Sequence, residues 1–194
     1  MRGVRLLFIM VVVCLGIAQA QAIGFVGGGT AGLSYPKDNT STAYSFALSL
    51  GGGLGVQLPI KRFMLEPELM YKPRKFSVGE TTATVSYFEI PVLLFFSIWP
   101  SLSVGAGFFG SYALDEISRT GALTSALTLE QASMRSYTGG FVASVRGYLF
   151  SASTVSLFVD SRYMQSLINP ATHGKITLRD FVLFIGLRVG KAGK

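Results

Sequence analysis

Residues 101–114, with the sequence SLSVGAGFFGSYAL, alternate between two classes of side chain. One face of this segment is mostly large and apolar and consists of Leu102, Val104, Ala106, Phe108, Gly110, Tyr112 and Leu114. The opposite face is mostly small or polar and consists of Ser103, Gly105, Gly107, Phe109, Ser111 and Ala113. Because successive side chains of a β-strand point to opposite sides, this period of two predicts a strand with one apolar face.

The same alternation recurs along the whole chain. The other predicted strands cover about residues 22–35, 43–57, 62–76, 84–97, 140–150, 154–164 and 177–189, and no long stretch has the 3.6-residue period of an amphipathic helix. The sequence therefore predicts an all-β fold of eight antiparallel strands. Pro67 and Pro91 fall within two of the segments, where the missing N–H donor predicts a bulge or a weak point in the pairing.

The predicted connections alternate between short and long. Tight turns are expected near residues 58–61, 98–101 and 150–153, and longer polar loops near 36–42, 77–83, 115–136 and 165–176. Residues 122–132 could extend a hairpin within the longest loop. Short turns on one side and long loops on the other are typical of outer-membrane barrels, with both termini on the periplasmic side.

Charged residues of the predicted strands share one face with most of the strand glycines. This face contains Glu66, Glu68, Lys72, Glu89, Arg146, Asp160, Arg162, Asp180 and Arg188. An eight-stranded barrel has an interior just wide enough for side chains to fill, and the acids and bases can pair there, as burial requires. A lipocalin-like soluble barrel would instead turn its large apolar side chains inward. The opposite face is nearly uncharged, and in water it would expose a larger apolar surface than soluble monomers tolerate. The sequence therefore predicts a transmembrane up-and-down β-barrel with this face toward lipid.

Six tyrosines lie on the apolar face, each at the long-loop end of its strand. They are Tyr35, Tyr44, Tyr71, Tyr112, Tyr137 and Tyr163. Tyrosine favours strands in general, but this placement predicts an aromatic girdle at one membrane interface. Phe63, Phe96 and Trp99 could serve the opposite interface.

The N-terminus has the features of a secretory signal peptide. Arg2 and Arg5 precede an apolar run at residues 6–17, and small residues at Ala20 and Ala22 offer two cleavage sites. A transmembrane helix needs about 20 apolar residues, so the run is too short for that alternative. Export and the strand pattern together predict the bacterial outer membrane as the location.

Removal of residues 1–22 leaves one domain, residues 23–194, as the β-barrel. Cys14 is the only cysteine, so the exported chain has no disulfide. Without Arg2 and Arg5, the 17 basic residues become 15, against 10 acidic ones. These charges are scattered and the chain is exported, so we expect no nucleic-acid binding and favour attraction to anionic lipid head groups.

Two segments resemble a known family. Residues 65–71, LEPELMY, resemble the "PEL-aromatic" strand of the PorT-like outer-membrane β-barrel proteins of Bacteroidetes, and residues 87–94, YFEIPVLL, resemble the "EIP-aliphatic" strand that follows it. The eight-strand plan is also similar to the transmembrane domain of outer membrane protein A. The resemblance implies an outer-membrane location. It does not imply one activity, because members include secretion-system components.

The residues do not indicate an enzyme. The only histidine is His173, with Ser166 and Thr172 nearby, and a nucleophile, a base and an orienting acid are not evident together. One histidine and no mature cysteine give no metal-binding pattern, and no cofactor is expected. Glu66 and Glu68 are two residues apart on the charged face, where salt bridges to arginine explain them better than acid–base catalysis.

The sequence therefore predicts an integral, monomeric outer-membrane barrel that is structural or binds partners through its loops. Its expected contacts are the lipid bilayer and lipopolysaccharide, with a possible protein partner at residues 115–136 and 165–176. The alternatives are an accessory component of a secretion system, a narrow pore, or a lipid-modifying enzyme. The charge-filled lumen argues against free conduction.

Overall fold

The computed structural model describes residues 24–38, 47–78, 81–120, 127–128, 136–152, 154–168 and 176–190. The described strands are β1 (Gly24–Asp38), β2 (Ala47–Ile60), β3 (Phe63–Val78), β4 (Thr81–Trp99), β5 (Leu102–Thr120), β6 (Leu127–Thr128), β7 (Tyr137–Ser151), β8 (Val155–Ser166) and β9 (Ile176–Val189). The predicted signal peptide at residues 1–22 lies outside these ranges, as do Tyr44 and His173.

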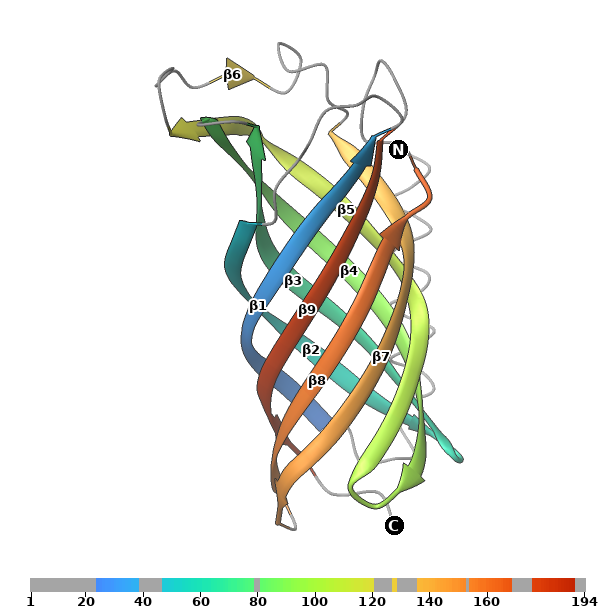
Figure 1. Cartoon of the computed structure of the whole chain (residues 1–194). Helices are drawn as coiled ribbons and strands as arrows, with labels where there is room; N and C mark the ends of the chain where they lie inside the picture. Colours follow the sequence, from blue (N-terminus) through green and yellow to red (C-terminus); the bar gives the residue numbers. More distant parts are fainter. Residues whose placement is uncertain are drawn as a thin grey trace.

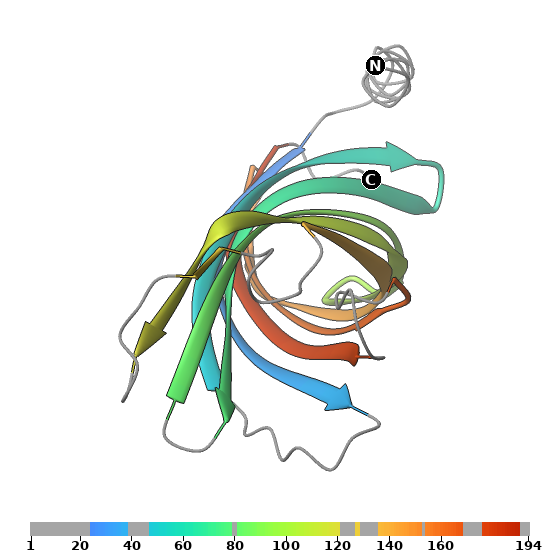
Figure 2. The same cartoon turned by 90° about the horizontal axis from the view of Figure 1, so that it is seen from above.

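Eight of the strands close into one barrel. They are paired in the order β4-β3-β2-β1-β9-β8-β7-β5, and a β4–β5 pairing completes the ring. The first and last strands are antiparallel neighbours, with Phe25 opposite Val189 and Ala31 opposite Leu183. The strands run obliquely to the long axis (Figure 1) and form a ring when seen from above (Figure 2), as barrel closure requires. The predicted eight-stranded, antiparallel up-and-down barrel is confirmed.

The two ends of the barrel differ in their connections. Turns at residues 61–62, 100–101 and 152–154 lie at the end where β1 starts and β9 finishes, which we call the turn side. The opposite end, the loop side, carries the connections β1–β2, β5–β7 and β8–β9, which are longer, and the short connection between β3 and β4. The three predicted tight turns are confirmed, each within a few residues.

Two predicted loops are partly strand. β3 continues to Val78 and leaves only two residues before β4, so the loop expected at 77–83 was wrong. The expected loop at 115–136 was also too long, because β5 continues to Thr120 in pairing with β4. Both runs are polar but rich in threonine, valine or isoleucine, whose branched side chains favour strands. β6 pairs with the end of β5, which confirms the hairpin expected within 122–132.

The prolines interrupt pairing without shifting it. The β3–β4 pairing skips two positions beside Pro67 and Pro91 and then resumes in the same register, so the weak point is present and the bulge is not. A proline lacks the N–H that the ladder would use. The register shifts in the described ladders lie at Val85/Tyr87, Ser97/Trp99 and Tyr148/Phe150.

The two faces of each strand differ sharply in exposure. Phe108 exposes 71 % of its surface, whereas its neighbour Phe109 exposes 6 %. Exposed apolar side chains come from every barrel strand and include Phe25, Leu54, Leu69, Ile90, Phe108, Val145, Val155 and Leu183. The barrel therefore has an apolar outer surface around its whole circumference.

Within the described ranges, no helix is both long enough and apolar enough to cross a membrane.

Candidate functional site

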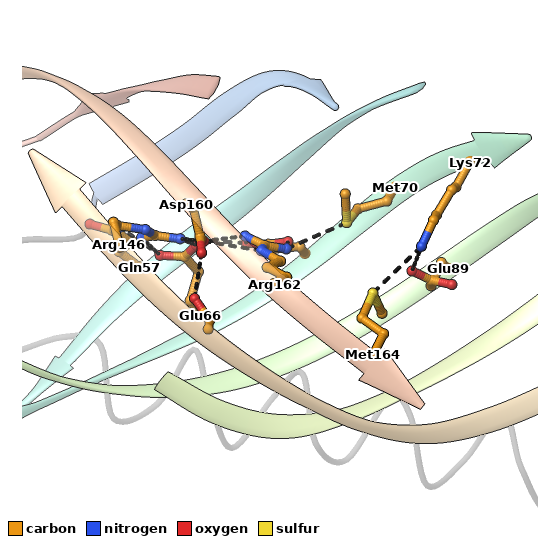
Figure 3. Close-up of polar contacts among 11 residues, drawn as sticks. Gln57, Glu66, Met70, Lys72, Glu89, Arg146, Asp160, Arg162 and Met164 are labelled. Atoms are coloured by element: carbon orange, nitrogen blue, oxygen red, sulfur yellow. Dashed lines mark hydrogen bonds and ion pairs between the residues drawn. The ribbon is translucent and has the colours of Figure 1, made fainter. Parts of the chain in front are cut away.

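Charged side chains from five strands meet inside the barrel. They are Glu66, Glu68, Lys72 and Arg74 from β3, Glu89 from β4, Arg146 from β7, Asp160 and Arg162 from β8, and Asp180 from β9. Each occupies an inward position of its strand and exposes at most 5 % of its surface. They form two clusters, one nearer the turn side and one nearer the loop side, and Figure 3 shows members of both.

The turn-side cluster consists of Glu66, Glu68, Arg146, Asp160 and Arg162. Arg146 is its centre and holds Glu66 with two parallel hydrogen bonds, from Nη1 to Oε2 at 2.7 Å and from Nη2 to Oε1 at 2.6 Å. Arg146 Nη2 also donates to Asp160 Oδ2 at 2.8 Å. Gln57 Nε2 adds a hydrogen bond to Glu66 Oε2 at 2.6 Å. Two parallel hydrogen bonds of this kind hold the carboxylate in one orientation in addition to strengthening the ion pair.

Arg162 repeats the arrangement with Glu68. Its Nη1 donates to Glu68 Oε2 at 2.5 Å and its Nη2 to Oε1 at 2.7 Å. Nε and Nη2 of Arg162 also donate to Asp160 Oδ2, at 3.0 and 2.8 Å, and Ser144 donates to the other oxygen of Asp160. As a result, both oxygens of each of the three carboxylates in this cluster are hydrogen-bonded.

The loop-side cluster consists of Lys72, Arg74, Glu89 and Asp180. Asp180 Oδ2 accepts from Lys72 Nζ at 2.7 Å and from Arg74 Nε and Nη2 at 2.9 and 2.8 Å. Arg74 Nη2 also donates to Glu89 Oε2 at 2.7 Å, and the Ser111 hydroxyl donates to the same oxygen at 3.0 Å. The two cations and two carboxylates balance in charge.

Aromatic rings cover the arginines inside the lumen. The guanidinium carbon of Arg146 lies 4.1 Å from the ring centroid of Phe95 and 4.3 Å from that of Phe158. Similar contacts join Arg162 to Phe184 at 5.0 Å and Arg74 to Tyr87 at 4.4 Å. A flat guanidinium stacks favourably on such rings, so the rings occupy the lumen beside the charged groups.

An apolar layer separates the two clusters. It contains the buried side chains Leu93, Phe109, Val142, Met164 and Val182. The sulfur of Met164 lies 3.6 Å from Lys72 Nζ, and the sulfur of Met70 lies 3.6 Å from Arg162 Nη1, as Figure 3 shows. From the turn side to the loop side, the lumen thus passes through an ionic, an apolar and a second ionic layer.

The structure brings eight of the nine charged residues expected in the lumen into these two clusters. The ninth, Arg188, lies on the same inward row near the turn side, is partly exposed, and sits opposite Val26 and Ser156 in the strand register. Sequence reasoning missed Arg74, although it lies two positions beyond Lys72 and therefore on the same face. The sequence analysis placed Phe109 on the inward face, but it did not predict that aromatic rings would stack on the arginines.

The tyrosines form part of a belt on the outer surface. Tyr71, Phe88, Tyr112 and Tyr137 are direct partners across β3, β4, β5 and β7, and all four are exposed. Tyr163 lies further round and contacts the rings of Phe141 and Phe181, at 6.1 and 5.2 Å between centroids. The backbone of Tyr35 belongs to β1, and Tyr44 lies outside the described residues.

The described part of the chain offers no group of three His, Cys, Asp or Glu side chains arranged to hold a metal ion. The carboxylates of the turn-side cluster are each held by arginine, an arrangement that fixes charge in place and leaves no carboxylate open as a general base. His173 lies outside the described residues, as do most of the loops at 115–136 and 165–176 that were expected to contact partners.

Three solved structures share this fold. OprG from Pseudomonas aeruginosa is 14 % identical, with a TM-score of 0.56 over 90 % of this chain and 97 % of that one. Neisserial surface protein A is 13 % identical, with a TM-score of 0.53 over 87 % and 98 %. Ail from Yersinia pestis, in complex with the heparin analogue sucrose octasulfate, is 10 % identical, with a TM-score of 0.51 over 86 % and 97 %. At these identities the likeness concerns the fold alone.

A comparison with curated proteins gives no significant match. The family model of the outer membrane protein beta-barrel domain, however, matches residues 17–171, which is most of the sequence. The closed eight-stranded ring, its apolar outer surface and its ion-paired lumen agree with that match. This chain therefore belongs to the outer membrane protein β-barrel domain family.

Proposed function

We propose that the protein is a sealed barrel of the bacterial outer membrane that anchors its long loops at the cell surface, where they bind partners. The ion-paired lumen carries this proposal. Two charged clusters, the apolar layer between them and the stacked aromatic rings fill the interior with side chains that are almost completely buried. An eight-stranded barrel has little interior space to spare, so an open path through it is not expected.

The membrane placement follows from the outer surface. The apolar surface contacts lipid, and the belt of Tyr71, Tyr112, Tyr137 and Tyr163 lies at the outer interface next to lipopolysaccharide. Aromatic rings with a polar tip favour that depth. The turn side then faces the periplasm, and residues 1–22 are removed during export.

Planar-bilayer recording tests the seal. The purified full-length protein, inserted in a bilayer beside a general porin as positive control, should give no steady conductance. A stable conductance proportional to voltage would contradict the sealed lumen and favour the narrow-pore alternative.

Chemical crosslinking in intact membranes tests the role of the loops. Partners crosslinked to the wild type should be lost when residues 121–135 are replaced by a short Gly/Ser linker. The same replacement at residues 169–175 tests the second loop that is expected to bind a partner. If both variants retain every partner, the loops are not the binding surface.

Membership of the PorT-like group and a secretion role remain the second candidate, supported by the motifs at residues 65–71 and 87–94. These motifs supply Glu66, Glu68 and Glu89, whose oxygens are bound to arginines in the lumen. Their positions are explained by the interior of the barrel without a secretion partner. Recovery of secretion-system proteins in the crosslinked material would favour this candidate over a lone barrel.

A further inference from the structure

The two charged clusters differ in how completely their carboxylate oxygens are bonded. In the turn-side cluster, every carboxylate oxygen accepts a hydrogen bond, and the atoms without a partner among the described residues are Arg146 Nε and Gln57 Oε1. In the loop-side cluster, Asp180 Oδ1 and Glu89 Oε1 have no hydrogen-bond partner in the described part of the chain. Lys72 Nζ lies 3.9 Å from Glu89 Oε1, which is too far for a hydrogen bond.

Two hydrogen-bond donors, one in this cluster and one beside it, also have no partner among the described residues. They are Arg74 Nη1 and the Tyr87 hydroxyl. Arg74 contacts Asp180 and Glu89 through its other nitrogens and stacks on the Tyr87 ring. The four residues therefore adjoin one another, and each exposes at most 2 % of its surface. Buried polar groups in proteins are almost always bonded to protein or to ordered water.

The side chains that flank this cluster differ between the turn side and the loop side. Toward the turn side lie the apolar layer and the aromatic rings that cover Arg146. Toward the loop side, the next described side chains on the inward rows of β4, β5, β7, β8 and β9 are neither aromatic nor charged, and they are Val85, Ala113, Thr138, Ser166 and Leu178. Two of these five carry hydroxyl groups that can pass a hydrogen bond onward.

We propose that the loop-side cluster is the floor of a hydrated chamber. Water molecules bind Asp180 Oδ1, Glu89 Oε1, Arg74 Nη1 and the Tyr87 hydroxyl, and they exchange with the medium outside the cell. The barrel is thus wet over its loop-side half and dry at the turn-side cluster. This inference goes beyond the sealed lumen, because it places the seal below the loop-side cluster and makes that cluster a binding site for water and other very small hydrophilic molecules.

Thiol labelling tests the chamber with two matched serines. Ser111 bonds Glu89 in the loop-side cluster and Ser144 bonds Asp160 in the turn-side cluster, and the two are about equally buried, with 5 % and 4 % exposed. Each is changed to cysteine in full-length protein carrying Cys14→Ser, in membranes. The probe is 2-aminoethyl methanethiosulfonate. Its aminoethylthio sulfur forms a disulfide with the cysteine sulfur, and methanesulfinate leaves and takes up the thiol proton. Mass spectrometry measures the labelled fraction.

Ser111→Cys should react at least about tenfold faster than Ser144→Cys, since thiol reactivity follows access to water. Ala113→Cys, one inward position further toward the loops, is a second reporter if Ser111→Cys folds poorly. If both loop-side cysteines stay unlabelled but react after unfolding, the chamber does not exist, although the sealed lumen could still stand. If Ser144→Cys reacts as fast as Ser111→Cys, the seal is also misplaced, and bilayer recording then decides whether any seal remains.

Discussion

Replacing Arg146 by methionine should lower the free energy of unfolding by about 3–5 kcal/mol, the usual cost of breaking a buried ion pair by removing one partner. The change removes three hydrogen bonds to Glu66 and Asp160 and leaves both carboxylates buried. Methionine is long and apolar, so packing against Phe95 and Phe158 is largely kept. Since about 1.4 kcal/mol is a factor of ten, the folding equilibrium should shift by about two to four orders of magnitude.

The charge balance of the turn-side cluster predicts that removing an arginine costs more stability than neutralising a carboxylate. Its five members carry three carboxylates and two guanidinium groups. Glu66→Gln removes one negative charge from this excess and keeps a group that Arg146 can still bond. We therefore expect a smaller loss, about 1–2 kcal/mol. The double variant Glu66→Gln/Arg146→Met should recover part of the loss of Arg146→Met, because the unpaired carboxylate is gone.

Urea titration of the barrel in lipid vesicles measures these values. Trp99 is the only tryptophan and lies exposed at the turn side, so its fluorescence should report insertion and unfolding. Gel migration with and without heating gives an independent folded fraction. A loss below about 1 kcal/mol for Arg146→Met, the average cost of a point substitution, would refute the reasoning. An equal loss for Glu66→Gln would refute the argument from charge balance.

Three further predictions concern packing, membrane depth and catalysis. Gly107→Ala should destabilise the barrel by about 1–3 kcal/mol or more, because the new Cβ would overlap the backbone of β4. Gly110→Ala should be neutral or stabilise by up to about 1 kcal/mol, because its Cβ meets no atom within 4 Å. Equal effects of the two variants in urea titration would contradict this. Leu183→Arg, at mid-membrane, should lower the free energy of unfolding by about 2–4 kcal/mol, and Ile60→Arg, beside a turn, by about 0–1 kcal/mol. The reverse order would show that the bilayer does not lie at the proposed height. His173→Ala should leave lipid A unchanged by mass spectrometry of cell envelopes, and acyl loss that depends on His173 would restore the enzyme hypothesis.

The barrel could be predicted from the sequence because the signal is local. Each strand carries the alternation within itself, and the parity of a position decides whether its side chain faces lipid or lumen. This is why Glu66, Glu68 and Asp180 could be assigned to the interior without knowing their partners. Arg74 has the same parity as Lys72 and was within reach of the same rule.

The pairing of the charges could not be predicted, because it depends on the stagger between strands. Arg146 reaches Glu66, which is 80 positions away in sequence, and Lys72 reaches Asp180, 108 positions away. No local pattern fixes such a contact, since it is set by the tilt and register of the closed ring. Strand ends were also misplaced at Thr120, because a polar run reads as loop until a neighbouring strand is known to pair with it.

The position of the two segments that resemble PorT-like motifs limits what these segments can reveal about function. The segments at 65–71 and 87–94 lie on adjacent strands, and their acidic residues are held inside the lumen by Arg146, Arg162 and Arg74. A motif of this kind predicts how the interior of a barrel is closed and stabilised. Among the described residues, the side-chain hydrogen bonds of these glutamates are to side chains inside the barrel, whereas the proposed partner binds at the loops. Two barrels could therefore share both motifs and the same sealed lumen while binding different partners. To find what determines the partner, the loops, and not the motifs, have to be exchanged between relatives.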